Sequence, residues 1–89
     1  MENKRPYVDF CVDDDEYTFD EETGNITMTA EEIKLCSIGD FEIEIGDLLN
    51  FDFYEGKVIQ YKCIDIDYLT GSVTFEFVGV IWEDEDYEE

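Results

Sequence analysis

The sequence predicts a small, mainly β domain: an antiparallel sheet or partly closed barrel of about five to seven strands, with at most one short helix near 30–37. Three observations support this. Apolar and polar residues alternate with a period of two, Gly-containing turn signals separate the runs, and the chain is 44% hydrophobic and 16% aromatic, unlike a disordered chain. With 89 residues, we expect one acidic β-rich domain over 1–82 and a solvated acidic C-terminal tail over 83–89.

The N-terminal part is predicted to hold a strand at 7–12 and a hairpin turn within 20–28. The turn segment reads Asp-x-x-Thr-Gly, followed by Asn, a β-branched residue, Thr and an apolar residue. The Asp can accept backbone N–H bonds at the start of a turn, and the Gly can adopt a positive φ. Just before this turn, Tyr17 and Phe19 are expected to anchor a strand from which the surrounding carboxylates project.

A short helix is predicted to begin after Thr29. Thr29 and Glu32 have the spacing of a capping box, and Gly39 is expected to mark the helix end. An edge strand remains the alternative for this segment.

The C-terminal part is predicted to be strands throughout. Alternation marks 41–45, 63–68 and 73–77, and two further strands are expected within 45–63, turned at 54–56. The side chains expected to face the core are Val8, Phe10, Val12, Phe41, Ile43, Ile45, Ile64, Ile66, Tyr68, Val73, Phe75 and Phe77.

Two further details concern the last two strands. The segment 67–75 repeats the turn pattern of 20–28, so a second hairpin of the same kind is expected. The run 78–83 is apolar at nearly every position, so we expect the last strand to become central or covered near its end. Gly79 would mark a bend or a close approach there.

Charge is the most unusual property of the chain. It has 26 Asp and Glu against 5 Lys and Arg, a net charge of −21. A small domain stays soluble with a net charge of about 2 to 8 in magnitude, and the excess destabilises the compact state by self-repulsion. Such an excess calls for a functional explanation, with adaptation to high salt as the alternative.

The residue types argue against an enzyme. The chain has no His, and it has no Gly-rich phosphate loop. Its cysteines, Cys11, Cys36 and Cys63, lack zinc-type spacing, and the negative field disfavours a thiolate. We therefore expect no catalytic residues and no cofactor. Buried thiols, no apolar run long enough to span a membrane and no signal peptide at the charged start favour a cytoplasmic protein.

A calcium loop is the metal site that the sequence comes nearest to. Asp65, Asp67 and Glu76 have the spacing of positions 1, 3 and 12 of such a loop, but Leu69 and Thr70 stand where a ligand and a Gly are required. A hairpin explains this segment better, so we expect no metal site.

Direct nucleic-acid binding is excluded, because phosphate contacts need a basic patch. The reverse case, in which this acidic chain binds a basic site that normally holds nucleic acid, is more informative. Acids at every second position of a strand lie about 6.7 Å apart and neighbouring strands ~4.8 Å apart, which approaches the charge density of one DNA strand. Fixed carboxylates can then replace phosphates in a Lys- and Arg-lined groove. The candidate partner-binding residues are Asp13, Asp14, Asp15, Glu16, Asp20, Glu42, Glu44, Asp65, Asp67 and Glu76.

Small size, acidity, missing catalytic parts and the carboxylate rows "DDDE", "EIE", "DID" and "EDED" resemble the DNA-mimic inhibitors of phages and other mobile elements. That class includes many anti-CRISPR and anti-restriction proteins. The resemblance implies inhibition of a basic nucleic-acid-binding enzyme, such as a CRISPR effector or a restriction nuclease, by occupation of its DNA- or RNA-binding groove. The alternative is an acidic interaction protein, a chaperone or assembly factor, that binds a basic protein partner.

Overall fold

The computed structural model describes residues 6–37 and 42–84. In these residues, six strands form a curled mixed sheet, and there is one short helix. The order across the sheet is β1-β4-β5-β6-β3-β2, and every pair except the parallel β1–β4 pair is antiparallel. The elements are β1 (Phe10–Cys11), β2 (Thr18–Phe19), β3 (Ile26–Thr29), α1 (Ala30–Cys36), β4 (Leu48–Asp52), β5 (Lys57–Asp67) and β6 (Ser72–Glu83). The predicted mainly β fold with one short helix is confirmed.

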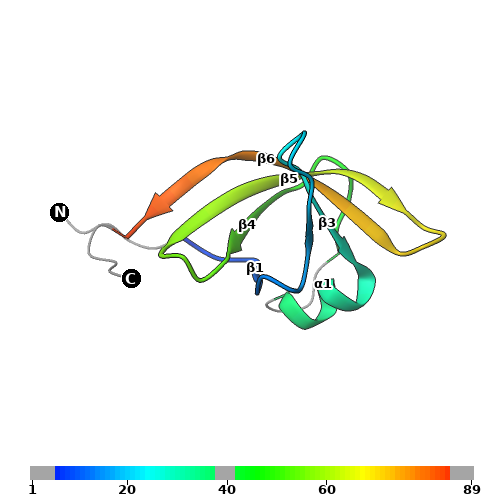
Figure 1. The fold of residues 1–89 in the computed structure, drawn as a ribbon, viewed down its shortest axis with the longest axis horizontal. Coiled ribbons are helices and arrows are strands. Elements are labelled where there is room, and N and C mark those ends of the chain that lie inside the picture. The colour runs from blue at the N-terminus through cyan, green and yellow to red at the C-terminus, as the bar shows by residue number, and fades with distance from the viewer. Residues whose placement is uncertain (1–5, 38–41, 85–89) are drawn as a thin grey trace.

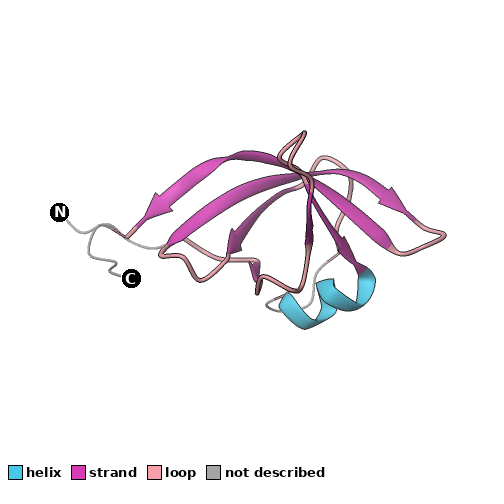
Figure 2. Cartoon of the chain, in the orientation of Figure 1, coloured by secondary structure: helices cyan, strands magenta, loops and turns pink. Residues whose placement is uncertain are grey.

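The long β5–β6 hairpin runs the length of the molecule, with the shorter strands and α1 on one side of it (Figure 1). The sheet is curled, as the cartoon in Figure 2 shows, and its buried side chains form a core rich in aromatic rings. Phe10 of β1, Phe51 of β4 and Phe75 of β6 are fully buried at its centre. The ring centroids of Phe10 and Phe51 lie 4.7 Å apart, and those of Phe51 and Phe75 lie 5.1 Å apart. Such ring pairs stabilise a core beyond their buried area.

Helix α1 has the predicted capping box. The Thr29 Oγ1 accepts a hydrogen bond from the Glu32 backbone N–H at 3.2 Å, and the Glu32 Oε1 accepts one from the Thr29 N–H at 2.9 Å. These bonds satisfy two backbone donors that the first turn of a helix leaves unpaired. The helix ends at Cys36, and the predicted stop at Gly39 lies outside the described residues.

Both predicted Asp-x-x-Thr-Gly turns are confirmed, and they have the same hydrogen bonds. Between β2 and β3, the Gly24 N–H donates to the Asp20 carbonyl oxygen at 2.7 Å, and Gly24 has a φ of +79°. Between β5 and β6, the Gly71 N–H donates to the Asp67 carbonyl oxygen at 2.8 Å, and Gly71 has a φ of +78°. Only glycine adopts this conformation without steric cost, which explains why the short pattern predicted the turn.

The strand predicted at 41–45 is wrong over its described part. Residues 42–44 have no regular structure and 45–46 form a turn, while Phe41 lies outside the described residues. The Glu44 N–H donates to the Asp47 Oδ2 at 2.9 Å, and the Asp47 N–H donates to the Glu44 carbonyl oxygen at 3.1 Å. Local hydrogen bonds of this kind compete with strand pairing, although Ile43 still packs against the core.

The predicted inward faces of the last two strands also need correction. Tyr68 lies in the β5–β6 turn and is 86% exposed. A register shift between Cys63 and Asp65 places Ile64 in a bulge, so that Cys63 rather than Ile64 is fully buried. A bulge adds one residue to a strand, so it changes which residues face inward. Periodicity in the sequence does not reveal such an insertion.

The last strand is not covered near its end, contrary to the prediction. β3 pairs only with residues 72–75 of β6, the paired half. Beside residues 77–81, the open half, the described residues provide no strand on the edge opposite β5. Val78, Val80 and Ile81 are consequently 43–47% exposed. A Cβ added to Gly79 would meet no atom within 4 Å, so no close approach occurs there.

Candidate partner-binding surface

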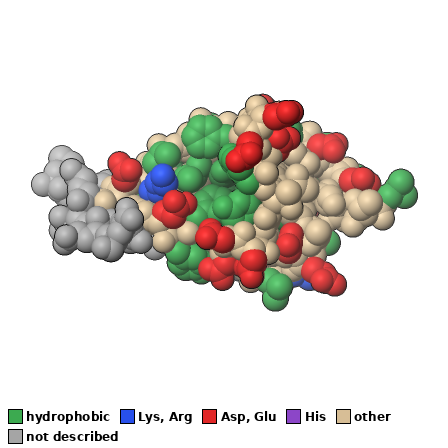
Figure 3. Space-filling model, viewed as in Figure 1, with side chains coloured by type: hydrophobic (Ala, Val, Ile, Leu, Met, Phe, Trp, Pro, Cys, Tyr) green, Lys and Arg blue, Asp and Glu red, His purple; other side chains and the backbone are tan. Residues whose placement is uncertain are grey.

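The ten predicted partner-binding residues do not form one continuous surface. Asp13, Asp14, Asp15 and Glu16 lie between β1 and β2, and Asp20 lies in the β2–β3 turn. Glu42 and Glu44 lie in the loop before β4, Asp65 and Asp67 in the last part of β5, and Glu76 in β6. Figure 3 shows acidic side chains distributed around one face of the molecule, with hydrophobic surface between them.

The first group forms one wall of a pocket. The parallel pairing of Phe10 with Phe51, continued by a hydrogen bond from the Val12 N–H to the Asp52 carbonyl oxygen at 2.9 Å, brings the β1–β2 connection beside the β4–β5 turn. Together they enclose a pocket of about 440 Å³. Its lining residues are Asp13, Asp14, Tyr17, Phe53, Tyr54 and Glu55. We call it the acidic–aromatic pocket.

Local hydrogen bonds fix the acidic side of this pocket. The Asp13 N–H donates to the Glu16 Oε1 at 2.9 Å, and the Glu16 N–H donates to the Asp13 carbonyl oxygen at 3.0 Å. The Cys36 Sγ–H also donates to the Glu16 Oε1 at 3.2 Å. The half-buried Glu16 side chain therefore stabilises the turn, whereas Asp13, Asp14 and Asp15 are exposed.

The pKa values of Glu16 and Cys36 are shifted in the directions expected from the hydrogen bond between them. Hydrogen bonds from the Asp13 backbone and from the Cys36 thiol lower the pKa of Glu16. Burial, and then the hydrogen bond and charge of Glu16, raise the pKa of Cys36 to about 12. The Cys36 thiol is thus kept protonated and acts as a buried hydrogen-bond donor.

Aromatic rings form the other side of the pocket. The Tyr17 and Phe53 ring centroids lie 5.1 Å apart in an edge-to-face arrangement. Tyr17 packs against the core, so its predicted anchoring role is confirmed. Phe19 is 53% exposed and does not anchor the strand, because the short strand β2 at the sheet edge leaves its side chain outside the core.

Tyr54 completes the pocket in an unusual conformation. Its φ is +62°, in the left-handed region that a tyrosine rarely occupies. The Tyr54 N–H donates to the Asp52 Oδ1 at 2.7 Å, which stabilises this backbone and places the Tyr54 ring in an exposed position at the turn. Strained backbone of this kind persists where the surrounding structure holds it, and it clusters at functional sites.

The pocket carries negative charge, and the described residues place no counter-charge beside it. Among residues 6–37 and 42–84, no hydrogen-bond donor or Lys pairs with the carboxylates of Asp13, Asp14 and Glu55. Burial, followed by the charges of Asp14 and Glu55, raises the pKa of Tyr17. The pocket can therefore accept a cation between carboxylates and ring faces.

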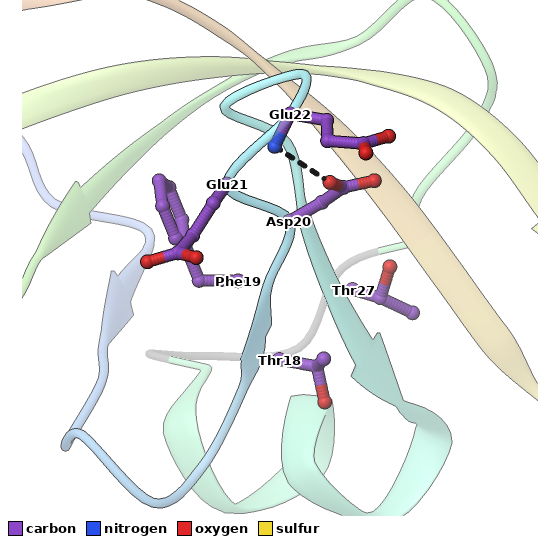
Figure 4. Close-up of a pocket in the computed structure, with 6 residues that line it drawn as sticks. All are labelled: Thr18, Phe19, Asp20, Glu21, Glu22 and Thr27. Carbon is purple, nitrogen blue, oxygen red and sulfur yellow. Dashed lines mark hydrogen bonds between the residues drawn. The ribbon is translucent and has the colours of Figure 1, made fainter.

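The remaining predicted residues have other surroundings. Asp20 and Asp67 accept backbone N–H bonds within their turns, from Glu22 and Leu69 respectively, so they have a structural role. Glu76 lies opposite Lys62 on β5, which offsets part of its charge. A second hollow, of about 730 Å³, lies around Asp20. Figure 4 shows the residues that line it, among them Glu21 and Glu22, which are exposed.

The loop that contains Glu44 is hydrogen-bonded to β5, the strand that contains Asp65, although the two segments are far apart in the sequence. The Cys63 N–H donates to the Asp47 carbonyl oxygen, and the Gly46 N–H donates to the Cys63 carbonyl oxygen, so the loop containing Glu44 runs beside β5. Glu42 and Glu44 lie in this loop and not in a strand, so they do not form an acid-faced strand next to β5. The regular DNA-like spacing expected from neighbouring strands is therefore not present here.

Sequence reasoning missed Phe53, Tyr54 and Glu55. Two of these are aromatic and one is acidic, and they directly precede a glycine, which is a usable signal for an exposed turn. Their proximity to Asp13 and Asp14 depends on the parallel β1–β4 pairing, which the local pattern does not contain.

Comparison of the chain with family models, with curated proteins and with solved structures gave no match. Among the described residues, no group of three or more His, Cys, Asp or Glu is arranged to hold a metal ion. None of the helices in the described ranges has the length and apolar character needed to cross a membrane.

Proposed function

We propose that this protein inhibits a basic nucleic-acid-binding enzyme, such as a CRISPR effector or a restriction nuclease, by occupying its DNA- or RNA-binding groove. The acidic–aromatic pocket carries the proposal. Its three carboxylates, which pair with no donor in the described part of the chain, and its aromatic rings suit an Arg or Lys side chain that normally holds a phosphate. The net charge of −21 would speed the encounter with a basic partner.

In the proposed mechanism, the pocket residues take the place of the phosphate and of the base of a nucleotide. Asp13, Asp14 and Glu55 take the place of phosphate oxygens and accept hydrogen bonds from a guanidinium or ammonium group. Tyr17 and Tyr54 offer ring faces, as bases do in single-stranded nucleic acid. The acids outside the pocket extend the negative field over the rest of the groove.

The proposal includes a cytoplasmic location. CRISPR effectors and restriction nucleases meet their substrates there, and the three cysteines are free, as suits a reducing compartment.

A competition assay tests the proposal. Labelled DNA is bound to each of a panel of CRISPR effectors and restriction nucleases, and this protein is titrated in. We expect it to displace DNA from at least one of them, less strongly as salt rises. If a nuclease that binds this protein keeps its DNA, mimicry is excluded. The alternative, an acidic assembly factor that binds a basic protein elsewhere, is then preferred.

Matched variants locate the binding surface. The triple variant Asp13→Asn, Asp14→Asn and Glu55→Gln removes the pocket charges, and we expect it to weaken displacement at least about tenfold, because charged contacts of this kind contribute roughly 1.5–3 kcal/mol each. The comparison variant Glu31→Gln, Glu42→Gln and Glu44→Gln changes the net charge equally at exposed sites away from the pocket. Because Glu42 and Glu44 belong to the ten predicted residues, it also tests whether that wider set contributes as much as the pocket does. Equal losses in the two variants would show that only total charge matters.

A further inference from the structure

The open half of β6 has one edge along which the described residues place no neighbouring strand. β6 runs over Ser72–Glu83, but β3 pairs only with its residues 72–75. On the far edge of residues 77–81, the described part of the chain supplies no strand. An unpaired edge exposes a row of backbone N–H and C=O groups that can bind another extended chain.

The side chains of this edge are apolar on both faces of the strand. Phe77 is 48% exposed, and Val78 and Val80 are each 47% exposed. The run 77–82 contains no charged residue, in a chain with 35% charged residues. Exposed apolar strand residues next to an unpaired backbone edge are a usual feature of strand-addition sites.

Acidic residues lie at both ends of the open half. β3 begins at Ile26, which pairs with Phe75, so the β2–β3 turn lies beside β6 just where the open half starts. Figure 1 shows this turn standing next to β6, and Figure 4 shows its acidic side chains. The turn carries Asp20, Glu21 and Glu22, and Glu83 and Asp84 follow the other end.

This charge pattern disfavours a second copy of the chain as the occupant. If a second copy paired antiparallel along this edge, residues 83–84 of each copy would lie against the acidic β2–β3 turn of the other. A parallel copy in register would place Glu76 beside Glu76 and Glu83 beside Glu83. Like charges directly opposite each other destabilise strand pairs, so the acids favour a cationic occupant instead.

We propose that the open half of β6 binds an extended segment with an apolar centre and Lys or Arg at both ends, which adds to the sheet as a further strand. The proposal rests on the proposed function only for the source of this segment, the basic partner protein. Main-chain hydrogen bonds supply the pairing, the apolar centre covers Val78 and Val80, and the cationic ends face the acids.

Two bulges limit the length of the added strand. The register of β6 against β5 shifts on either side of Gly79, which leaves Val78 and Ile81 as extra residues. Bulges bend a strand and increase its twist, so a long flat strand would not pair along the whole edge. A short segment fits this edge best.

The test uses a labelled synthetic peptide with lysines at both ends and alternating valine and threonine between them. We expect it to bind and to slow amide hydrogen exchange at residues 77–81 of the full chain. A peptide with glutamates in place of the lysines should not bind, and one with proline at its centre should bind more weakly, because proline lacks the N–H that pairing requires. A free protein that is already dimeric, with slow exchange at 77–81, would overturn the proposal.

Matched variants separate edge binding from general charge attraction. The double variant Val78→Lys and Val80→Lys should weaken peptide binding about tenfold or more, since lysines protect strand edges and repel the cationic ends. The control, Tyr68→Lys and Leu69→Lys, makes the same charge change in the β5–β6 turn, at side chains that are 86% and 97% exposed. Equal weakening in both variants, or no slowing of exchange at 77–81, would overturn the proposal.

The outcome is independent of the acidic–aromatic pocket. The variant Asp13→Asn, Asp14→Asn and Glu55→Gln should retain slow exchange at 77–81 with the peptide, even though it loses DNA displacement. If DNA displacement fails for every enzyme while the peptide still protects 77–81, the edge site stands and the mimic function fails. If DNA is displaced but the peptide does not protect 77–81, the edge site fails and the mimic function stands.

Discussion

The two halves of β6 have similar sequences and different surroundings. In the paired half, Val73 and Phe75 are buried between neighbouring strands β5 and β3. In the open half, Phe77, Val78 and Val80 are about half exposed, although they are as apolar. The difference arises because β3 is only four residues long and its first residue, Ile26, lies beside Phe75, so that β3 does not extend along the open half. Burial in this sheet therefore depends on the length of the neighbouring strand.

The largest expected effect separates the two halves directly. Phe75→Ala removes a fully buried ring in contact with Phe10 and Phe51, and it should lower the free energy of unfolding by about 3–5 kcal/mol. Phe77→Ala removes a half-exposed ring that contacts Tyr61 alone among the described aromatic pairs, and it should cost about 1 kcal/mol.

Urea unfolding monitored by circular dichroism measures both values. Phe75→Leu serves as a milder variant in case Phe75→Ala does not fold, with an expected cost of about 1–2 kcal/mol. Similar costs for Phe75→Ala and Phe77→Ala would mean that the open half is covered in solution, contrary to the described pairing.

The paired half could be predicted from the sequence and the open half could not. Alternation at 73–77 and the Asp-x-x-Thr-Gly turn are local patterns, and both Val73 and Gly71 have the predicted environment. The exposure of Val80 depends on where β3 ends, which is a property of another segment. Likewise, Asp13 and Asp14 were identified as exposed acids, whereas the pocket they form with Glu55 required the β1–β4 pairing.

The turn that begins the paired half gives the next largest effect. Gly71→Ala places a Cβ at a positive φ and 3.4 Å from the Ala30 Cβ, so it should destabilise the protein by roughly 1–2 kcal/mol. Gly24→Ala has the same φ penalty with no atom within 4 Å of the new Cβ, and it should cost about 1 kcal/mol. Thermal unfolding of both variants measures the difference, and a larger loss for Gly24→Ala would contradict the packing of this turn on α1.

A pH titration tests the buried face opposite the open half. Tyr61 lies opposite Phe77, and burial, followed by the charges of Tyr17 and Glu55, raises its pKa to about 12. The unfolded chain loses this proton near the ordinary pKa of 10 while the folded chain retains it, so stability should fall as pH rises from about 10 to 12, by an amount on the order of 1 kcal/mol.

Urea unfolding at a series of pH values measures this loss, with Tyr61→Phe as the variant that lacks the ionisable group. The variant should keep the smaller part of the loss that comes from the other groups with raised pKa values, which are Cys36, Cys63, Tyr17 and Tyr54. An unchanged pH dependence in Tyr61→Phe would place the Tyr61 hydroxyl in contact with solvent.

The smallest expected effect lies at the boundary between the two halves, where Glu76 of β6 faces Lys62 of β5. A double-mutant cycle with Lys62→Gln and Glu76→Gln should give a coupling free energy of about 0.2–1 kcal/mol, because opposite charges directly across two strands attract each other. Salt should act in opposite directions on this pair and on the whole fold. The coupling should shrink as salt screens the attraction, while the melting temperature should rise because salt also screens the repulsion within a chain of net charge −21. A melting temperature that falls between low and physiological salt would mean that local attractions, such as the one between Lys62 and Glu76, outweigh the overall repulsion. The repulsion within the acidic surface would then be weaker than the net charge of the chain implies.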